Sequence, residues 1–181
     1  MNTNIEKEFK LLVDEEVFYK LCSFYPQLQF KKQVNTYYDT IDHQIQKRKG
    51  AMRIREVNDE YIFTLKLWKD EDLLEFECEV DDNTLASLQK DEVQELLTAY
   101  DIQGELYELT TLITHRGMII TDDAELCFDI NEYNNHKDYE IEYEYKRDHD
   151  GYEVFNKILK QVSLSYTKNC SSKIKRALDS L

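Results

Sequence analysis

The residues of this chain that could do chemistry are carboxylates and cations placed at every second position. Glu6, Glu8 and Lys10 open the chain in this way. The same spacing recurs later: Arg53 and Arg55; Thr64 and Lys66; Glu75, Glu77 and Glu79; Glu140, Glu142 and Glu144. In an extended strand, every second side chain lies on the same face. A sheet with both acidic and basic rows could therefore hold metal ions and an anion together.

Each row taken alone also fits an ordinary solvated strand face, because charged residues are mostly exposed. Sulfur and imidazole ligands find no support in the spacing. The four cysteines are far apart and predict free thiols, and the four histidines lack the spacing of zinc ligands. Any bound metal is therefore expected to be held by oxygen atoms.

Alternating hydrophobicity predicts the strands that must position these rows. The expected strands cover residues 4–12, 31–39, 50–57, 60–69, 72–81, 105–121, 124–133 and 138–147. Helical spacing predicts a short helix at 14–24 with Asp14 as its N-cap, one or two helices from about 85 to 100, and helices around 154–162 and 174–181. The segment Val57-Asn58-Asp59-Glu60 is typical of a tight hairpin turn.

This layout predicts an α+β fold in one domain over residues 1–181. About eight strands joined mainly by hairpins favour antiparallel pairing, and that number can close into a barrel. Alternation does not decide which face points inward. The charged rows would normally face water, but several helices need an apolar surface to pack on, which would let the charged rows line a wet interior.

Composition narrows the class of protein. The 181 residues are 33% charged and 41% hydrophobic, with one proline and four glycines, which favours a folded chain over a disordered one. No apolar run approaches the roughly 20 residues of a membrane span, so no membrane partner is expected and the cytoplasm is the expected compartment. A net charge of -14 disfavours nucleic acid as a partner, although a small anion in a local basic pocket stays compatible with it.

Taken in order, the motifs resemble those of the CYTH domain, or triphosphate tunnel metalloenzyme, family. The resemblance runs nearly end to end. It rests on the E-x-E-x-K at Glu6, Tyr37-Tyr38-Asp39-Thr40, Ala51-Met52-Arg53-Ile54-Arg55, Thr64-Leu65-Lys66, Glu75-Phe76-Glu77, Phe128-Asp129, Tyr139 to Glu144, and Ser172 to Leu178. The order and spacing of these fragments are specific, whereas any one of them is weak.

The resemblance implies a closed antiparallel eight-stranded β-barrel, with helices packed outside, whose tunnel binds a triphosphate and divalent metal. It implies metal ligands at Glu6, Glu8, Asp129, Glu140 and Glu142, with Glu144, Glu75 and Glu77 as less certain members. Hard Mg²⁺ or Mn²⁺ ions prefer such carboxylate oxygens. The residues expected to act in catalysis are Glu6, Glu8, Lys66 and Glu142.

The phosphate-binding residues implied by the resemblance are Lys10, Arg53, Arg55, Lys66, Arg116 and Lys173. Arginine can grip phosphate oxygens bidentately, and lysine offers a compact charge. The chain departs from the family at one position, because many members carry a lysine two residues before Arg116 where this chain has Thr114.

The leading hypothesis is a metal-dependent hydrolase that cleaves inorganic triphosphate or a small organic triphosphate. Neither a G-x-x-x-x-G-K nor a G-x-G-x-x-G loop occurs, so no nucleoside-binding motif is present. A class IV adenylyl cyclase, which belongs to the same family, is the nearest alternative. A non-catalytic module that binds polyphosphate or nucleotide is a second, and a barrel for apolar ligands is disfavoured by the charged rows.

Overall fold

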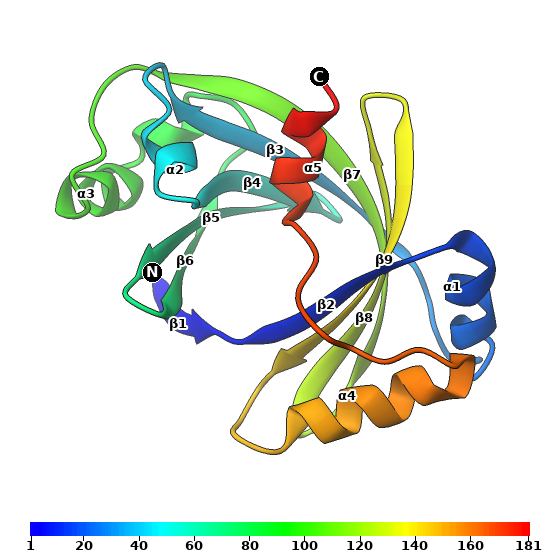
Figure 1. Ribbon diagram of the computed structural model, residues 1–181. Helices are drawn as coiled ribbons and strands as arrows, with labels where there is room; N and C mark the ends of the chain where they lie inside the picture. Colours follow the sequence, from blue (N-terminus) through cyan, green and yellow to red (C-terminus); the bar gives the residue numbers. More distant parts are fainter. The chain divides into compact units, whose positions relative to one another are not determined.

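A computed structural model describes residues 1–181 and contains nine strands with helices between them (Figure 1). The strands are β1 (Asn2–Glu6), β2 (Glu8–Val13), β3 (Lys31–Thr40), β4 (Ala51–Val57), β5 (Glu60–Lys69), β6 (Asp72–Val80), β7 (Leu106–Ile120), β8 (Ala124–Tyr133) and β9 (His136–Tyr145). The helices are α1 (Glu15–Cys22), α2 (Gln44–Lys47), α3 (Asp91–Ala99), α4 (Gly151–Leu159) and α5 (Lys173–Asp179), with 3-10 turns η1 (Ser87–Gln89) and η2 (Lys160–Val162).

The chain divides into two compact units. Unit 1 comprises Met1–Glu6 and Gln33–Leu112, and unit 2 comprises Lys7–Lys32 and Ile113–Leu181.

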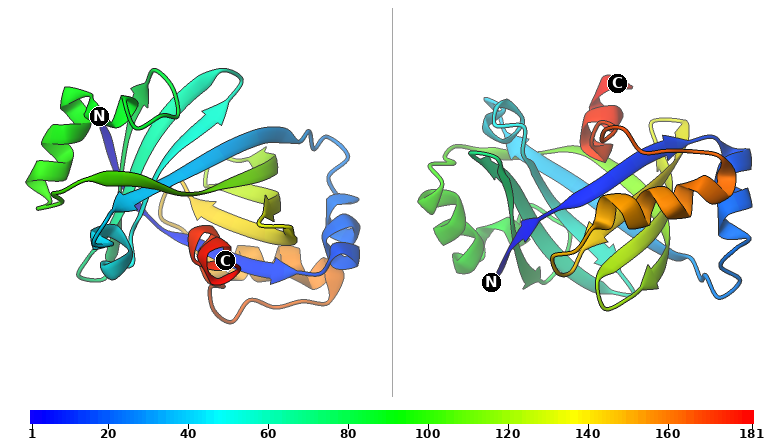
Figure 2. Two further views of the ribbon diagram at one scale, coloured as in Figure 1. Left: turned by 90° about the horizontal axis from the view of Figure 1, so that it is seen from above. Right: turned by 60° about the horizontal axis from the view of Figure 1, so that its bottom comes forward.

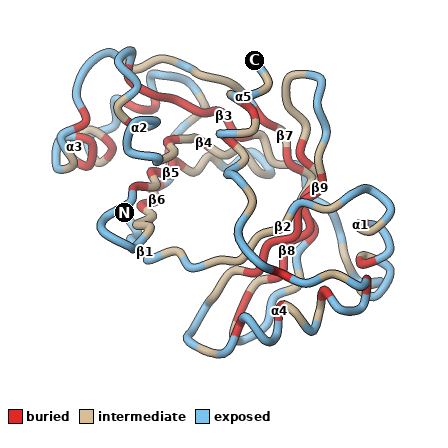
Figure 3. Tube along the Cα trace, in the orientation of Figure 1, coloured by how far each residue is buried: buried red, intermediate tan, exposed pale blue.

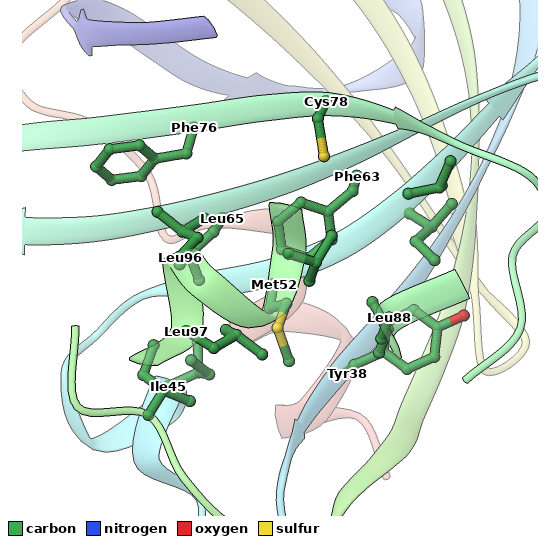
Figure 4. Close-up of a cluster of buried hydrophobic side chains, with 14 of the residues drawn as sticks. Tyr38, Ile45, Met52, Phe63, Leu65, Phe76, Cys78, Leu88, Leu96 and Leu97 are labelled. Carbon is green, nitrogen blue, oxygen red and sulfur yellow. The ribbon is translucent and has the colours of Figure 1, made fainter. Parts of the chain in front are cut away.

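Unit 1 is an antiparallel sheet in the order β1-β6-β5-β4-β3, continued by the first part of β7. The β4–β5 hairpin turns at Asn58 and Asp59, which both have positive φ, as the predicted tight turn requires. Helices α2 and α3 and the turn η1 pack on one face of this sheet. Figure 4 shows the resulting core, in which Met52, Phe63 and Leu65 of the strands meet Leu96 and Leu97 of α3.

Unit 2 is an antiparallel sheet in the order β2-β9-β8, continued by the second part of β7. Helices α1 and α4 lie along one face of it (Figure 2). The predicted N-cap is confirmed, because the Asp14 side chain accepts a hydrogen bond of 2.8 Å from the Val17 amide. The core is rich in aromatic rings: Phe18 of α1 packs against Phe128 of β8, and Phe155 of α4 stacks on Tyr143 of β9.

The parts of the sheet in the two units show which face carries the charged rows. In unit 1, Phe63, Leu65 and Leu67 point to the helices, so Thr64 and Lys66 point to the opposite face. In unit 2, Ile141 and Tyr143 point to the helices, so Glu140 and Glu142 point away from them. The buried stretches of both units are visible in Figure 3. Within each unit, therefore, the charged face is the one that α1 to α4 leave uncovered.

The expected closed eight-stranded barrel needs correction. The sheet has nine strands, and the strand order has two ends, β1 and β2, where a ring would have none. The difference arises at Lys7, which interrupts the single strand predicted at residues 4–12. Before Lys7 the chain pairs with β6, and after it the chain pairs with β9. The α+β class, the antiparallel pairing and the helices on the apolar faces are as predicted. No helix has the length and apolar character that crossing a membrane requires.

Candidate active site

Three buried carboxylates form the centre of the charged face in unit 2. Asp129 of β8 stands directly opposite Glu140 of β9, and Glu142 follows two residues later on the same face. Their exposed fractions are 0%, 1% and 6%. One oxygen from each lies within 4.8 Å of the others. Burying three acids together requires cations, because a buried ionised group is costly unless it is paired.

Lys173 supplies the central cation. Its Nζ lies 2.9 Å from Asp129 Oδ2, 2.9 Å from Glu140 Oε1 and 2.5 Å from Glu142 Oε1. The helix that carries it, α5, is capped by Ser172, whose side chain accepts from the Lys175 amide. The ammonium is therefore in contact with all three carboxylates at once.

Arg116 and Arg176 complete the set of cations. Arg116 of β7 makes a bidentate pair with Asp129, at 2.7 and 2.5 Å, and also bonds Glu142. Arg176 of α5 pairs with Asp138 at 2.8 Å and bonds the second oxygen of Glu140. Every oxygen of the three central carboxylates accepts from at least one of the three cations. Such charge-assisted bonds are the strongest that side chains make.

The surroundings shift the pKa values of Glu140 and Glu142 in opposite directions. Burial, opposed by Lys173 and reinforced by Glu142, raises the pKa of Glu140 to about 7. Burial also disfavours ionisation of Glu142, but Lys173 and Arg116 outweigh it and hold the pKa of Glu142 well below its usual value. The three carboxylates hold the pKa of Lys173 well above its usual value in spite of burial. The site thus keeps Glu142 ionised and leaves Glu140 able to exchange a proton near neutral pH.

This donor set fits a hard divalent cation. Carboxylate oxygens are the ligands that Mg²⁺ and Mn²⁺ prefer, and the three acids already converge on one point. That point is now served by the ammonium of Lys173, a cation of lower charge. A divalent ion would use Asp129, Glu140 and Glu142, which are three of the five predicted metal ligands.

Lys10 and Glu8 flank this centre on β2. Lys10 stands opposite Glu142, and its Nζ bonds Glu8 Oε1 at 2.5 Å. Both side chains are mostly buried, with exposed fractions of 16% and 11%. Glu8 stands opposite Glu144 in the same register. The predicted residues Glu8 and Lys10 therefore belong to the same charged face as the three acids.

Thr114, which stands where many family members carry a lysine, belongs to a buried hydrogen-bond network. Thr114 is buried, and its hydroxyl donates to Asn131 Oδ1 at 2.8 Å. Asn131 in turn donates to Asp138 at 2.9 Å, and Asp138 accepts from Arg176. The chain of bonds ends at Glu140 through Arg176. Thr114 is thus linked through Asn131 and Asp138 to the guanidinium of Arg176 on α5.

Unit 1 carries the remaining predicted residues on its own charged face. Lys66 of β5 bonds Glu6 Oε1 at 2.5 Å and Glu75 Oε2 at 2.9 Å. Thr64 donates to Glu77 at 3.2 Å. Glu75 and Lys66 are register partners, so their ion pair joins the neighbouring strands β5 and β6.

The two arginines of β4 extend this face towards β3. Arg55 Nε donates to Asn35 Oδ1 at 3.0 Å. Arg53 stands between Tyr37 on one side and Thr64 on the other, and its buried Nε has no hydrogen-bond partner. A buried N–H without an acceptor costs free energy that a bound anion could recover. The arginine pair is therefore suited to accept oxygens from a ligand.

The structure gathers the predicted residues into one cluster in each unit. Unit 1 holds Glu6, Arg53, Arg55 and Lys66, with Glu75 and Glu77; unit 2 holds Glu8, Lys10, Arg116, Asp129, Glu140, Glu142 and Lys173, with Glu144. A cavity of about 620 Å³ lined by residues of η1, α3 and the following loop contains none of them. Sequence reasoning missed Asp138, Asn131 and Arg176. Arg176 had a usable signal, because it follows Lys173 by three residues and so shares its helix face.

Known proteins resemble this chain over nearly its whole length. The sequence model of the CYTH domain matches residues 4–177. YjbK of Bacillus subtilis strain 168, a protein provisionally named a triphosphatase, is 32% identical over 177 residues that cover 93% of each chain. A crystal structure from Bacillus halodurans, provisionally named an adenylate cyclase, is 34% identical with a TM-score of 0.86, over 97% of this chain and 98% of that one. HpAC1 from Hippeastrum, studied as an adenylyl cyclase and described as having a dominant triphosphatase activity, shares the fold at 22% identity, with a TM-score of 0.78 over 94% of each chain.

Proposed function

Because the chain belongs to the CYTH domain family, we propose that it is a divalent-metal-dependent hydrolase of inorganic triphosphate or of a small organic triphosphate, acting as one domain over residues 1–181. The observation that carries the proposal is the buried set of Asp129, Glu140 and Glu142, each oxygen of which is held by a cation. Acids for a metal and cations for phosphate are what a triphosphate and its counter-ion need from a protein.

The proposed roles follow from the chemistry of each side chain. Asp129, Glu140 and Glu142, with Glu6 and Glu8, are the proposed ligands of Mg²⁺ or Mn²⁺. The proposed phosphate-binding residues are Lys10, Arg53, Arg55, Lys66, Arg116 and Lys173. The support for Arg53 is its buried Nε, which has hydrogen-bonding capacity to spare. The support for Arg116 is its fork geometry, already bidentate towards Asp129 and equally suited to phosphate oxygens.

In the proposed reaction, water attacks the terminal phosphorus in line and the remaining phosphates leave. The protein needs no covalent nucleophile, since phosphoryl transfer depends mainly on positioning and on stabilising charge. Glu142 stays ionised and can accept a hydrogen bond from the attacking water. Lys66 can neutralise charge on a phosphate oxygen. A bound divalent ion would supply further charge neutralisation and a more acidic water.

The Bacillus subtilis relative, 32% identical, is provisionally named a triphosphatase. This name favours hydrolysis over cyclisation of ATP and over binding without catalysis. The provisional name of the Bacillus halodurans relative keeps adenylyl cyclase as the second candidate. In that reaction the ribose 3′-oxygen would attack the α-phosphorus, and the products would be cyclic AMP and pyrophosphate.

A phosphate-release assay tests the proposal directly. The protein is incubated with tripolyphosphate, ATP and thiamine triphosphate, each with Mg²⁺, Mn²⁺ or EDTA, and cyclic AMP is measured in the ATP samples. Metal-dependent phosphate release supports the hydrolase. Cyclic AMP with pyrophosphate would replace it with the cyclase, and intact triphosphate throughout would refute both enzymatic proposals.

A further inference from the structure

Trp68 is exposed on the charged face of unit 1, directly beyond Lys66. Along β5 the side chains of Phe63, Leu65 and Leu67 enter the core, so Trp68 points to the opposite face together with Lys66. Its exposed fraction is 51%, which is high for a large aromatic side chain. An indole therefore stands on the same face as the proposed phosphate-binding residues of this unit.

The neighbours of Trp68 place it beside the charged groups. Trp68 stands opposite Leu73 of β6, and Leu73 stands opposite Glu6 of β1. The next row along the sheet contains Lys66 and Glu75, and Lys66 bonds both Glu6 and Glu75. The rise of a strand puts Trp68 about 7 Å along the sheet from Lys66. The indole thus lies one side-chain row away from a cation suited to phosphate.

Packing within the hairpin leaves much of the indole uncovered. Leu73 is its register partner on the neighbouring strand, and the β5–β6 turn at Asp70 and Glu71 follows immediately. On this face the adjoining positions of the sheet hold the charged residues Lys66, Glu75 and Glu6, together with the apolar residues Leu73 and Ala51. A flat apolar ring beside a row of charges matches a ligand that is itself flat at one end and charged at the other.

We propose that Trp68 is a specificity-determining residue that stacks on the planar ring of an organic triphosphate whose phosphates bind at Lys66. The inference rests on the proposed function and extends it to a substrate class: triphosphates carrying an aromatic ring, such as a nucleobase or the rings of thiamine. Base–aromatic stacking tolerates many rings because each presents a π-face. Inorganic triphosphate lacks the ring, so Trp68 contributes nothing to its binding.

The chain offers a direct probe, since Trp68 is its only tryptophan. Titration with a non-hydrolysable ATP analogue should change the intrinsic fluorescence of the protein, whereas tripolyphosphate should change it little. Parallel titrations with CTP and thiamine triphosphate distinguish a purine, a pyrimidine and a thiamine ring as the preferred partner. Equal fluorescence responses to tripolyphosphate and to all ring-bearing ligands would contradict stacking.

Substitution gives the second arm of the test. Trp68→Ala should weaken binding of the ATP analogue, measured by calorimetry, by roughly 5- to 150-fold, the range that alanine substitution of a stacking residue produces. Trp68→Phe should retain most of the affinity. The control is Phe24→Ala, which removes another exposed aromatic ring, 49% exposed, in unit 2.

Tripolyphosphate hydrolysis separates this inference from the function on which it rests. If Trp68→Ala hydrolyses tripolyphosphate like the wild type but binds the ATP analogue poorly, the inference stands. If the variant loses both to the same degree, or neither, Trp68 has no role in choosing the substrate and the inference is refuted. If the wild type hydrolyses no triphosphate, the proposed function fails, and the calorimetric comparison still decides whether Trp68 recognises a ring.

Discussion

Replacing Lys173 by methionine should make the metal-free protein less stable and its response to Mn²⁺ larger. The ammonium of Lys173 contacts Asp129, Glu140 and Glu142, the same acids that would bind the ion. The ion and the ammonium therefore compete for one set of oxygens. Methionine has a similar length and no charge, so Lys173→Met removes the competitor and leaves the packing of α5 largely in place.

The magnitudes follow from the burial of the group. Removing one partner from a buried ion pair costs about 3 to 5 kcal/mol. The lower figure applies here, because Arg116 and Arg176 still neutralise part of the charge. In a chain of this size about 3 kcal/mol lowers the melting temperature by roughly 6 to 12 °C. A tenfold gain in Mn²⁺ affinity would add about 1.4 kcal/mol of stabilisation at saturating metal, or roughly 3 to 6 °C.

Thermal unfolding with EDTA and with a series of Mn²⁺ concentrations measures both effects. Lys175→Met is the matched control, because Lys175 lies on the same helix but forms an exposed pair with Asp179. We expect the control to resemble the wild type in both conditions. The reasoning is refuted if Mn²⁺ stabilises Lys173→Met no more than the wild type, since the ammonium would then not compete with the ion.

Three further predictions concern single residues of the two clusters. Arg55→Ala should raise KM for the triphosphate by roughly 10- to 100-fold with a smaller change in kcat, as expected for a lost charged hydrogen bond of about 1.5 to 3 kcal/mol, and an unchanged KM in steady-state kinetics would contradict it. Glu8→Gln should raise the Mn²⁺ concentration needed for half-maximal activity about tenfold, because one ligand charge is lost, and a metal titration of activity that overlays the wild type would rule Glu8 out as a ligand. The raised pKa of Glu140, about 7, means that the metal-free folded state binds a proton more tightly than the unfolded state, so this residue's contribution to stability is complete below about pH 4.5 and is lost as pH rises through 7. Urea unfolding in EDTA from pH 5 to 8 should show this falling slope in the wild type and a flatter one in Glu140→Gln, and parallel slopes would contradict the assignment.

The sequence predicted most elements because their signals are local. Alternation located the long strands, and the pair Asn58-Asp59 marked a hairpin whose two residues can adopt positive φ. Helix α2 had no such signal. It has four residues and is held by the buried side chain of Asp39, which accepts from the amides of Thr40, Ile45 and Gln46. Local hydrophobic periodicity cannot predict a four-residue helix that depends on a side-chain acceptor outside the helix.

The strand break at Lys7 was hidden for a related reason. Alternation continues unchanged from Glu6 through Glu8 to Lys10, so the pattern predicts one strand, while the change of partner from β6 to β9 depends on residues far along the chain. Two charged residues of the buried network, Asp138 and Arg176, were not among the predicted site residues. Resemblance supplied Lys173, but Arg176 makes as many contacts with the acids' network and was identified only from the structure.

The change of partner at Lys7 also sets the order in which the chain can fold during synthesis. Residues 2–6 pair with residues 73–77, and residues 8–13 pair with residues 139–144. The ribosome therefore releases β2 long before its partner exists, and the sheet of unit 2 cannot be completed until most of the chain has been made. Until then the apolar side chains of Phe9 and Leu11 lack their final neighbours. A nascent chain that stalls before residue 136 would carry β2 unpaired. The free N–H and C=O groups of this strand could then pair with another chain and cause aggregation.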